Sequence, residues 1–162
     1  MMVRVTVLAL MLTALVGAQA VVDKRLTSED VAKVVGITGI RSVARGAQTG
    51  AGGDLNFSRP DGKLLLMVNF GDAKLYTKAR QQKQTTVGGK AYPMELFAHR
   101  VTGVGEEAFA SPPGSVQYVI YARKGNNAIS VTSFYSSAGE AIRPLLNEAQ
   151  LKSIAQTIFS RW

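Results

Sequence analysis

The 162-residue chain contains no cysteine and only one histidine. The absence of cysteine excludes disulfide bonds, cysteine nucleophiles, thiolate metal sites and thiol redox chemistry. Because His99 is the only histidine, a metal motif built on two histidines cannot form. The sequence offers His99 neither a nucleophile nor an orienting partner, so we interpret it as a strand residue at a sheet edge. We therefore expect no metal site.

The motifs of phosphate-binding loops are missing or out of context. Each of the two Gly-Lys pairs lacks the earlier glycine of a P-loop, because Phe57 and Gln84 occupy the required positions. No G-x-S-x-G nucleophile elbow is present. Residues 103–108 match the dinucleotide string G-x-G-x-x-A, but a predicted hairpin follows instead of a helix, and two acidic residues would repel phosphate. We expect no cofactor.

Long apolar runs are confined to the N-terminus. Residues 1–20 combine Arg4, an apolar stretch over 5–16 and small residues at positions 18 and 20, a pattern typical of a signal peptide cleaved after Ala20. The alternative is an N-terminal membrane anchor, but the apolar run is short for a hydrocarbon layer of about 30 Å. We therefore predict an exported protein, periplasmic or secreted, with one domain over residues 21–162 and no integral membrane span.

Acidic residues are scarce, with 11 Asp and Glu against 19 Lys and Arg, and the formal net charge is +8. Between residues 73 and 100, six cations accompany a single acid, Glu95. Such a face can attract anionic lipid headgroups, acidic polysaccharide or an acidic protein, although it can also serve solubility alone. Nucleic acid is not an expected partner outside the cytoplasm, and few aromatic residues accompany the cations. The candidate binding residues are Lys74, Lys78, Arg80, Lys83, Lys90 and Arg100.

Alternating apolar residues within 101–135 predict a β-hairpin around a turn at residues 124–127. A second hairpin is predicted for 54–58 and 63–70, because Arg59-Pro60-Asp61-Gly62 fits a type I turn. The apolar run 64–68 indicates a strand buried on both faces. The residues expected to share one face of each strand in the first hairpin are Val116, Tyr118, Ile120 and Ala122, and then Ile129, Val131 and Ser133.

The remaining segments are predicted as one short strand, over 40–47, a flexible loop over 48–53, a turn or loop over 85–92 and a connector over 136–144. Residues 37–40 and 101–104 align at a constant offset, which hints at an internal duplication of strand, loop, hairpin and helix. Shared strand and turn composition is the alternative explanation of this alignment.

Capping patterns predict where three helices begin. Thr27 can cap a helix that ends at Gly36, and Asp72 can cap a helix that runs to about Lys83 with Leu75 and Ala79 facing inward. Asn147 with Gln150 forms a capping box at the start of a C-terminal amphipathic helix. The apolar stripe that should bury this last helix against the sheet consists of Leu151, Ile154, Ala155, Ile158, Phe159 and Trp162.

The predicted order of helix, three strands, helix, three strands and helix resembles the Mog1/PsbP-like α/β sandwich, in particular small exported bacterial proteins of unknown function. Residues 26–31 and 101–109 and the hairpin that follows carry the resemblance. It implies an α+β fold, with an antiparallel sheet built from two strand-hairpin units and flanked by helices. Members of this class are mostly binding or accessory proteins, which implies a non-enzymatic role. The resemblance assigns no functional residue.

Our leading hypothesis is an exported binding or accessory domain with a basic face for an anionic partner. The alternative is a hydrolase of an envelope polymer, which would need carboxylates that the fold brings together. Adjacent Glu106 and Glu107 would point to opposite faces of a strand, and Asp54, Asp61 and Asp72 stand beside turn residues. A third possibility, small-ligand binding between sheet and helix, requires a cavity lined by Tyr118, Phe134 or Phe159.

Overall fold

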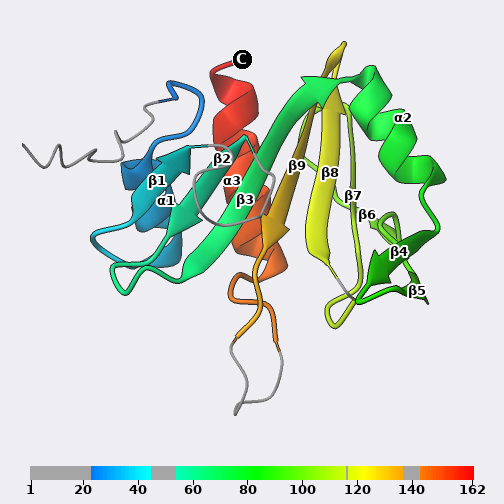
Figure 1. Cartoon of the computed structure of the whole chain (residues 1–162). Helices are drawn as coiled ribbons and strands as arrows, with labels where there is room; N and C mark the ends of the chain where they lie inside the picture. The colour runs from blue at the N-terminus through cyan, green and yellow to red at the C-terminus, as the bar shows by residue number, and fades with distance from the viewer. Residues whose placement is uncertain (1–22, 45–53, 116, 137–142) are drawn as a thin grey trace, which may run out of the picture.

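The computed structural model describes residues 23–44, 54–115, 117–136 and 143–162 (Figure 1). The predicted signal peptide, the loop over 48–53 and Val116 lie outside the described residues. In the described part, the chain forms three α-helices and nine strands, which confirms the α+β class. None of these helices is long and apolar enough to cross a membrane.

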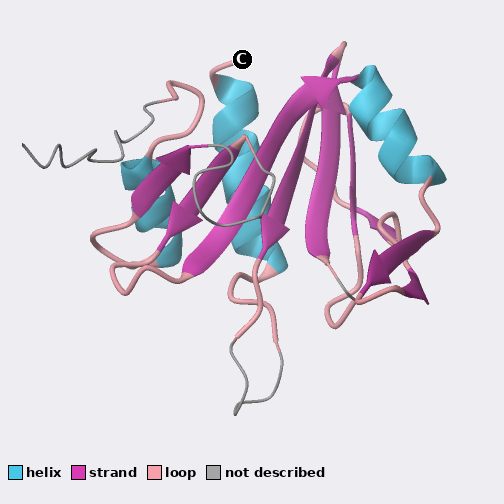
Figure 2. Ribbon diagram, viewed as in Figure 1, coloured by secondary structure: helices cyan, strands magenta, loops and turns pink. Residues whose placement is uncertain are grey.

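Seven strands form one sheet with only antiparallel neighbours, in the order β1-β2-β3-β9-β8-β7-β6 (Figure 2). These strands are β1 (Arg41–Ala44), β2 (Leu55–Ser58), β3 (Leu64–Asp72), β6 (His99–Arg100), β7 (Glu107–Ala110), β8 (Tyr118–Lys124) and β9 (Asn127–Ser133). Both predicted hairpins are confirmed as β2–β3 and β8–β9. The run 64–68 is buried at Leu65, Leu66 and Val68, whereas Leu64 and Met67 are half-buried.

The segment predicted as a turn or loop over 85–92 is a separate two-stranded hairpin, so that prediction is wrong. It consists of β4 (Gln84–Val87) and β5 (Lys90–Pro93), with Thr85 opposite Tyr92. Gly88 and Gly89 connect the strands with φ angles of 56° and 79°. Two adjacent glycines reach this left-handed region at little cost, and they close the short turn of a hairpin.

The first and last helices begin as their capping patterns predict. α1 (Ser28–Val35) starts at Thr27, whose hydroxyl accepts from Asp30 N while the Asp30 carboxylate accepts from Thr27 N. α3 (Glu148–Ser160) starts at the same kind of box between Asn147 and Gln150. Each box satisfies backbone N–H groups that the first turn of a helix leaves without a partner.

α2 (Ala73–Gln81) begins at the predicted cap, where Asp72 Oδ1 accepts from Lys74 N at 2.8 Å, but it ends before Lys83. Its buried face differs from the expected one. Tyr76 and Ala79 are buried, and Leu75 is only half-buried. Ala79 faces inward as expected, so the buried face is turned by only about 50° relative to the expectation, half of the roughly 100° step between residues. This turn brings a tyrosine onto the sheet.

The helices cover opposite faces of the sheet, as alternate residues of β8 show. Ile120 and Ala122 join the main core with α3, whereas Val119 joins a smaller cluster with Ala79 of α2. Figure 1 shows α1 and α3 side by side on one face, with α2 near the other end of the sheet. The predicted burial of α3 is confirmed for Leu151, Ile154, Ala155, Ile158 and Phe159, and Trp162 is half-buried against the same core.

The predicted duplication agrees with the strands and not with the helices. The order β1-β2-β3-β9-β8-β7 is symmetric about the boundary between β3 and β9. A two-fold axis that exchanges these antiparallel halves must stand perpendicular to the sheet, and it would place both following helices on one face. Since α2 and α3 lie on opposite faces, the symmetry does not extend to them.

The C-terminal end of α3 is tied to the start of α1 by a two-pronged ion pair. Arg161 Nη1 lies 2.6 Å from Asp30 Oδ2, and Nη2 lies 2.8 Å from Oδ1. The Arg161 guanidinium holds the pKa of the Asp30 carboxyl well below its usual range, and hydrogen bonds from Thr27 lower it further. The same carboxylate thus serves both the helix cap and the contact between the two helices.

We expect Asp30→Asn to lower stability at neutral pH and to flatten its dependence on pH in the acid range. Because the pKa of Asp30 is lower in the folded state, its charge stabilises the fold above the unfolded-state pKa of about 3.9, and this contribution is lost as the pH falls. The difference between the urea midpoints of wild type and variant should be constant from about pH 7 to about pH 5, begin to shrink below about pH 4, and close only at the much lower folded-state pKa of Asp30. Glu29→Gln, at an exposed acid of the same turn, is the control. An unchanged pH dependence in Asp30→Asn would contradict this assignment.

Candidate functional site

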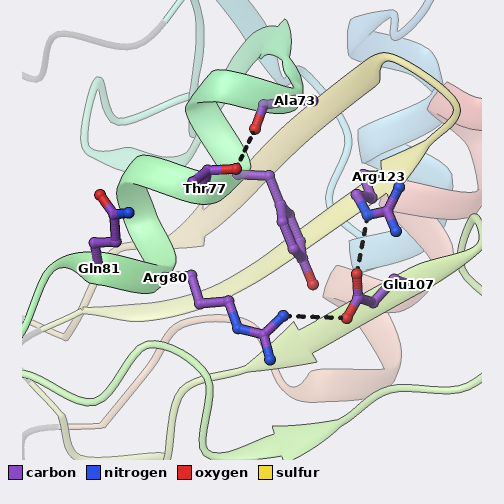
Figure 3. A pocket seen from close by; sticks show the side chains of 7 residues that line it. Ala73, Thr77, Arg80, Gln81, Glu107 and Arg123 are labelled. Carbon is purple, nitrogen blue, oxygen red and sulfur yellow. Dashed lines mark hydrogen bonds and ion pairs between the residues drawn. The ribbon is translucent and has the colours of Figure 1, made fainter.

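A hollow of about 590 Å³ lies between α2 and the strands β7 and β8 (Figure 3). From α2 it is lined by residues at three- and four-residue spacing, which places them on one helical face. Glu107 of β7 and Arg123 of β8 stand directly opposite each other in the sheet and line the other side. The helix residues of this lining are Ala73, Tyr76, Thr77, Arg80 and Gln81.

Two arginines converge on the Glu107 carboxylate in this hollow, as Figure 3 shows. Arg123 Nε donates to Glu107 Oε2 at 2.9 Å, and Arg80 Nη1 lies 3.5 Å from Oε1. Glu106 Oε2 lies 3.8 Å from Arg123 Nη1. The two adjacent glutamates therefore reach one guanidinium, unlike the expected opposite orientation, because Glu106 lies in the bend before β7 and not in the strand.

The hydroxyl of Tyr76 is buried beside these charges and has no hydrogen-bond partner. The residue as a whole is only 4% exposed. Burial, followed by the negative charge of Glu107, raises the pKa of Tyr76 to about 12. The hydroxyl therefore keeps its proton at neutral pH beside the Glu107 carboxylate.

An aromatic cluster fixes the position of Tyr76 and of the arginines. The Tyr76 ring meets Phe97 edge-on at 5.2 Å between centroids, and Phe97 stacks on Tyr121 at 5.4 Å. The guanidinium carbon of Arg123 lies 5.9 Å from the Tyr76 ring centre, and that of Arg80 lies 5.9 Å from the Phe109 ring centre. Aromatic pairs and cation–π contacts of this kind stabilise one arrangement of the charged groups.

Two smaller hollows adjoin the first one along α2. One of about 300 Å³ shares Ala73, Thr77 and Gln81 with it and adds Lys74 and Lys78. Another of about 270 Å³ shares Arg80 and adds Lys83, together with the segment from Met94 to Phe97. We call the cations that line these three neighbouring hollows the α2 basic surface; they are Lys74, Lys78, Arg80, Lys83 and Arg123.

The structure brings four of the six predicted binding residues onto this surface, and the other two lie elsewhere. Lys90 is exposed on β5 of the separate hairpin, and Arg100 is exposed on β6, opposite Phe109. Neither lines these three hollows. Arg123 was missed because it follows α2 by more than forty residues. The alternation of β8 was the available signal, since it places Arg123 on the face opposite Ile120 and Ala122.

The aspartates that a hydrolase could recruit have structural partners. Asp54 Oδ2 accepts from Phe70 N at 2.8 Å, Asp72 caps α2, and Asp61 Oδ2 lies 3.7 Å from Arg59. No group of three or more His, Asp or Glu side chains among the described residues could hold a metal ion. This arrangement provides no observation that favours a paired-carboxylate reaction.

The other sequence candidates also have clear positions. His99 lies in the edge strand β6, as predicted, with Nε2 2.7 Å from Glu148 Oε2 at the start of α3. The glycine-rich residues 103–108 lead into β7 and not into a helix. Tyr118 and Phe159 are buried in the main core, so they do not line a cavity with Phe134, which borders a separate hollow.

Comparison of the chain with protein-family models, with curated proteins and with solved structures gives no match. A functional assignment therefore rests on the geometry of the α2 basic surface. Its five cations line the hollows together with Glu107, which pairs with two of them, and with the buried hydroxyl of Tyr76.

Proposed function

We propose that the protein is an exported, non-enzymatic binding or accessory domain that holds an anionic partner on the α2 basic surface. The observation that carries this proposal is a row of three hollows that share lining residues along one helix and are lined by five cations and by the acids Glu95 and Glu107. The pattern of residues 1–20 supports export, to the periplasm or beyond. The three strands between α1 and α2 and the final helix α3 support a Mog1/PsbP-like sandwich as the finer description of the fold, although six strands, and not the expected three, lie between α2 and α3.

The exposed cations would attract the partner, and the Arg80 side of the first hollow would bind it. Lys74 and Lys78 lie one turn apart and are exposed, so their field reaches into solvent. The Arg80 side chain is 59% exposed and makes one ion pair, at 3.5 Å, which leaves donors for an incoming oxyanion. Anionic lipid headgroups, acidic polysaccharide and acidic protein share such oxyanions.

We expect Lys74→Glu/Lys78→Glu to weaken binding to vesicles of anionic phospholipid at least about tenfold, which corresponds to about 1.4 kcal/mol. Reversing both charges removes long-range attraction and adds repulsion, and exposed side chains contribute little to folding. Wild-type binding should also fall steeply with salt, because the Debye length drops from about 10 Å at 0.1 M to about 3 Å at 1 M. Co-sedimentation at both salt concentrations measures both effects, with an acidic polysaccharide as a parallel probe.

The double reversal Lys24→Glu/Lys33→Glu is the matched control. It changes the net charge by the same amount, at exposed positions before and within α1. If it weakens binding as much as the α2 pair does, the attraction reflects net charge and not this surface. If the wild type binds neither probe at low salt, the proposal is wrong, and Lys74 and Lys78 serve solubility alone.

A further inference from the structure

A second large hollow, of about 580 Å³, shares no lining residue with the α2 basic surface. One wall is the turn between β2 and β3, with Arg59, Asp61 and Lys63. The opposite wall is the chain just after β9, with Phe134 and its neighbours. The volume falls within the range of about 300–1,000 Å³ that is typical of small-molecule sites.

The polar wall contains a buried donor without an acceptor. Arg59 Nε is buried and has no hydrogen-bond partner. The nearest carboxylate oxygen to this guanidinium, Asp61 Oδ2, lies 3.7 Å from Nη2, which is too long for a hydrogen bond. The turn itself is fixed, because Arg59 N donates to Lys63 O and Gly62 N donates to Arg59 O, both at 2.9 Å. Nε itself is closed off, but the Arg59 side chain is 39% exposed, so its terminal nitrogens are the donors that an acceptor in the hollow can reach.

The apolar wall is held equally firmly. Phe134 N donates to Leu65 O at 3.0 Å, and Leu145 N donates to Phe134 O at 2.8 Å, which ties the returning chain to the end of β9. The Tyr135 hydroxyl donates to the carbonyl oxygen of Ser115 at 2.5 Å. A wall fixed in this way does not have to become ordered when a ligand binds, which reduces the entropic cost of binding.

We propose that this hollow binds a small organic acid through one carboxylate and an apolar body. The carboxylate accepts from the terminal Nη–H groups of Arg59, and Lys63 adds a second positive charge at the same wall. Leu64, Phe134 and Leu145 receive the apolar body. Two cations and one acid leave a single excess positive charge among the lining residues, which suits a monoanion better than a polyanion.

The test uses 4-phenylbutanoate and the matched alcohol 4-phenylbutan-1-ol, which has the same apolar body without the charge. Titration of the isotope-labelled protein followed by amide chemical shifts gives the affinity and location of each probe. We expect the acid to shift residues 59–64, 134–136 and 145 and to bind at least about tenfold more tightly than the alcohol, about 1.4 kcal/mol. Arg59→Gln should remove that preference. Lys33→Gln, at an exposed cation of α1, should retain it.

Two further variants separate the donor from the charge and from the apolar wall. Arg59→Lys keeps the positive charge and removes the planar guanidinium with its paired terminal donors, so it should bind the acid with an intermediate affinity. Leu145→Ala should weaken the acid and the alcohol alike. Equal binding of acid and alcohol, unchanged acid binding in Arg59→Gln, no saturable shift, or shifts only around Lys74 and Lys78 would each overturn the proposal. Shifts only around Lys74 and Lys78 would still support anion binding at the α2 basic surface.

Discussion

Ile154→Ala is expected to lower the free energy of unfolding by about 2–5 kcal/mol. Ile154 lies in α3, is fully buried, and belongs to the cluster that joins this helix to β8 and β9. Truncation removes apolar contacts and leaves a cavity that neighbouring side chains fill only in part. Urea unfolding of the whole chain measures the loss as a shift in midpoint with an unchanged slope.

Gln156→Ala, on the same helix, is the control for this prediction. Gln156 is exposed, and its side chain donates a 2.8 Å hydrogen bond from Nε2 to the carbonyl oxygen of Gly103. The loss of one such bond costs about 0.5–1.5 kcal/mol. If the two variants lose equal stability, α3 does not dock on the sheet through the face that contains Ile154.

The helix ends and the two hairpins could be predicted because short-range chemistry determines them. Thr27 with Asp30, and Asn147 with Gln150, are capping pairs whose partners stand three residues apart. A capping interaction of this kind is visible in any sequence that contains it. The alternation along β8 and β9 likewise follows from the geometry of a strand, independently of what covers the sheet.

The hairpin β4–β5 could not be predicted with the same signal, because its strands lack apolar alternation. Its β5 residues are all exposed, so no core face specifies the pairing of Thr85 with Tyr92. The rotation of α2 also depends on contacts between distant parts of the chain. The Tyr76 ring packs on Phe97 and is buried between α2 and the sheet. The larger aromatic side chain is buried there in place of Leu75.

Only the helical part of the α2 basic surface is visible in the sequence. Lys74 and Lys78 stand four residues apart, which suffices to predict a common face. The pairing of Glu107 with Arg123 requires the register of β7 against β8, and the approach of Arg80 to Glu107 requires the docking of α2. The sequence therefore predicted attraction for an anion but not the hollow in which it would bind.

We expect Gly105→Ala to lower the free energy of unfolding by at least about 3 kcal/mol. Gly105 has a φ of +55°, which already disfavours a side chain. A Cβ at this position would also lie 2.4 Å from the backbone oxygen of Arg123 and 3.3 Å from the Phe159 ring. That same oxygen accepts a 2.9 Å hydrogen bond from Glu106 N, so the backbone cannot move away without losing it.

Gly125→Ala separates the steric clash from the backbone conformation. Gly125 lies in the turn between β8 and β9 with a φ of +57°, almost the same as that of Gly105, but an added Cβ would meet no atom within 4 Å. This variant should lose only the conformational term of about 1–2 kcal/mol. The difference between the two urea midpoints therefore measures the close approach of Gly105 to β8. Equal losses would show that the Arg123 backbone moves away from the added Cβ at little cost. The segment before β7 would then not fix the position of β8, the strand that carries the Arg123 side chain.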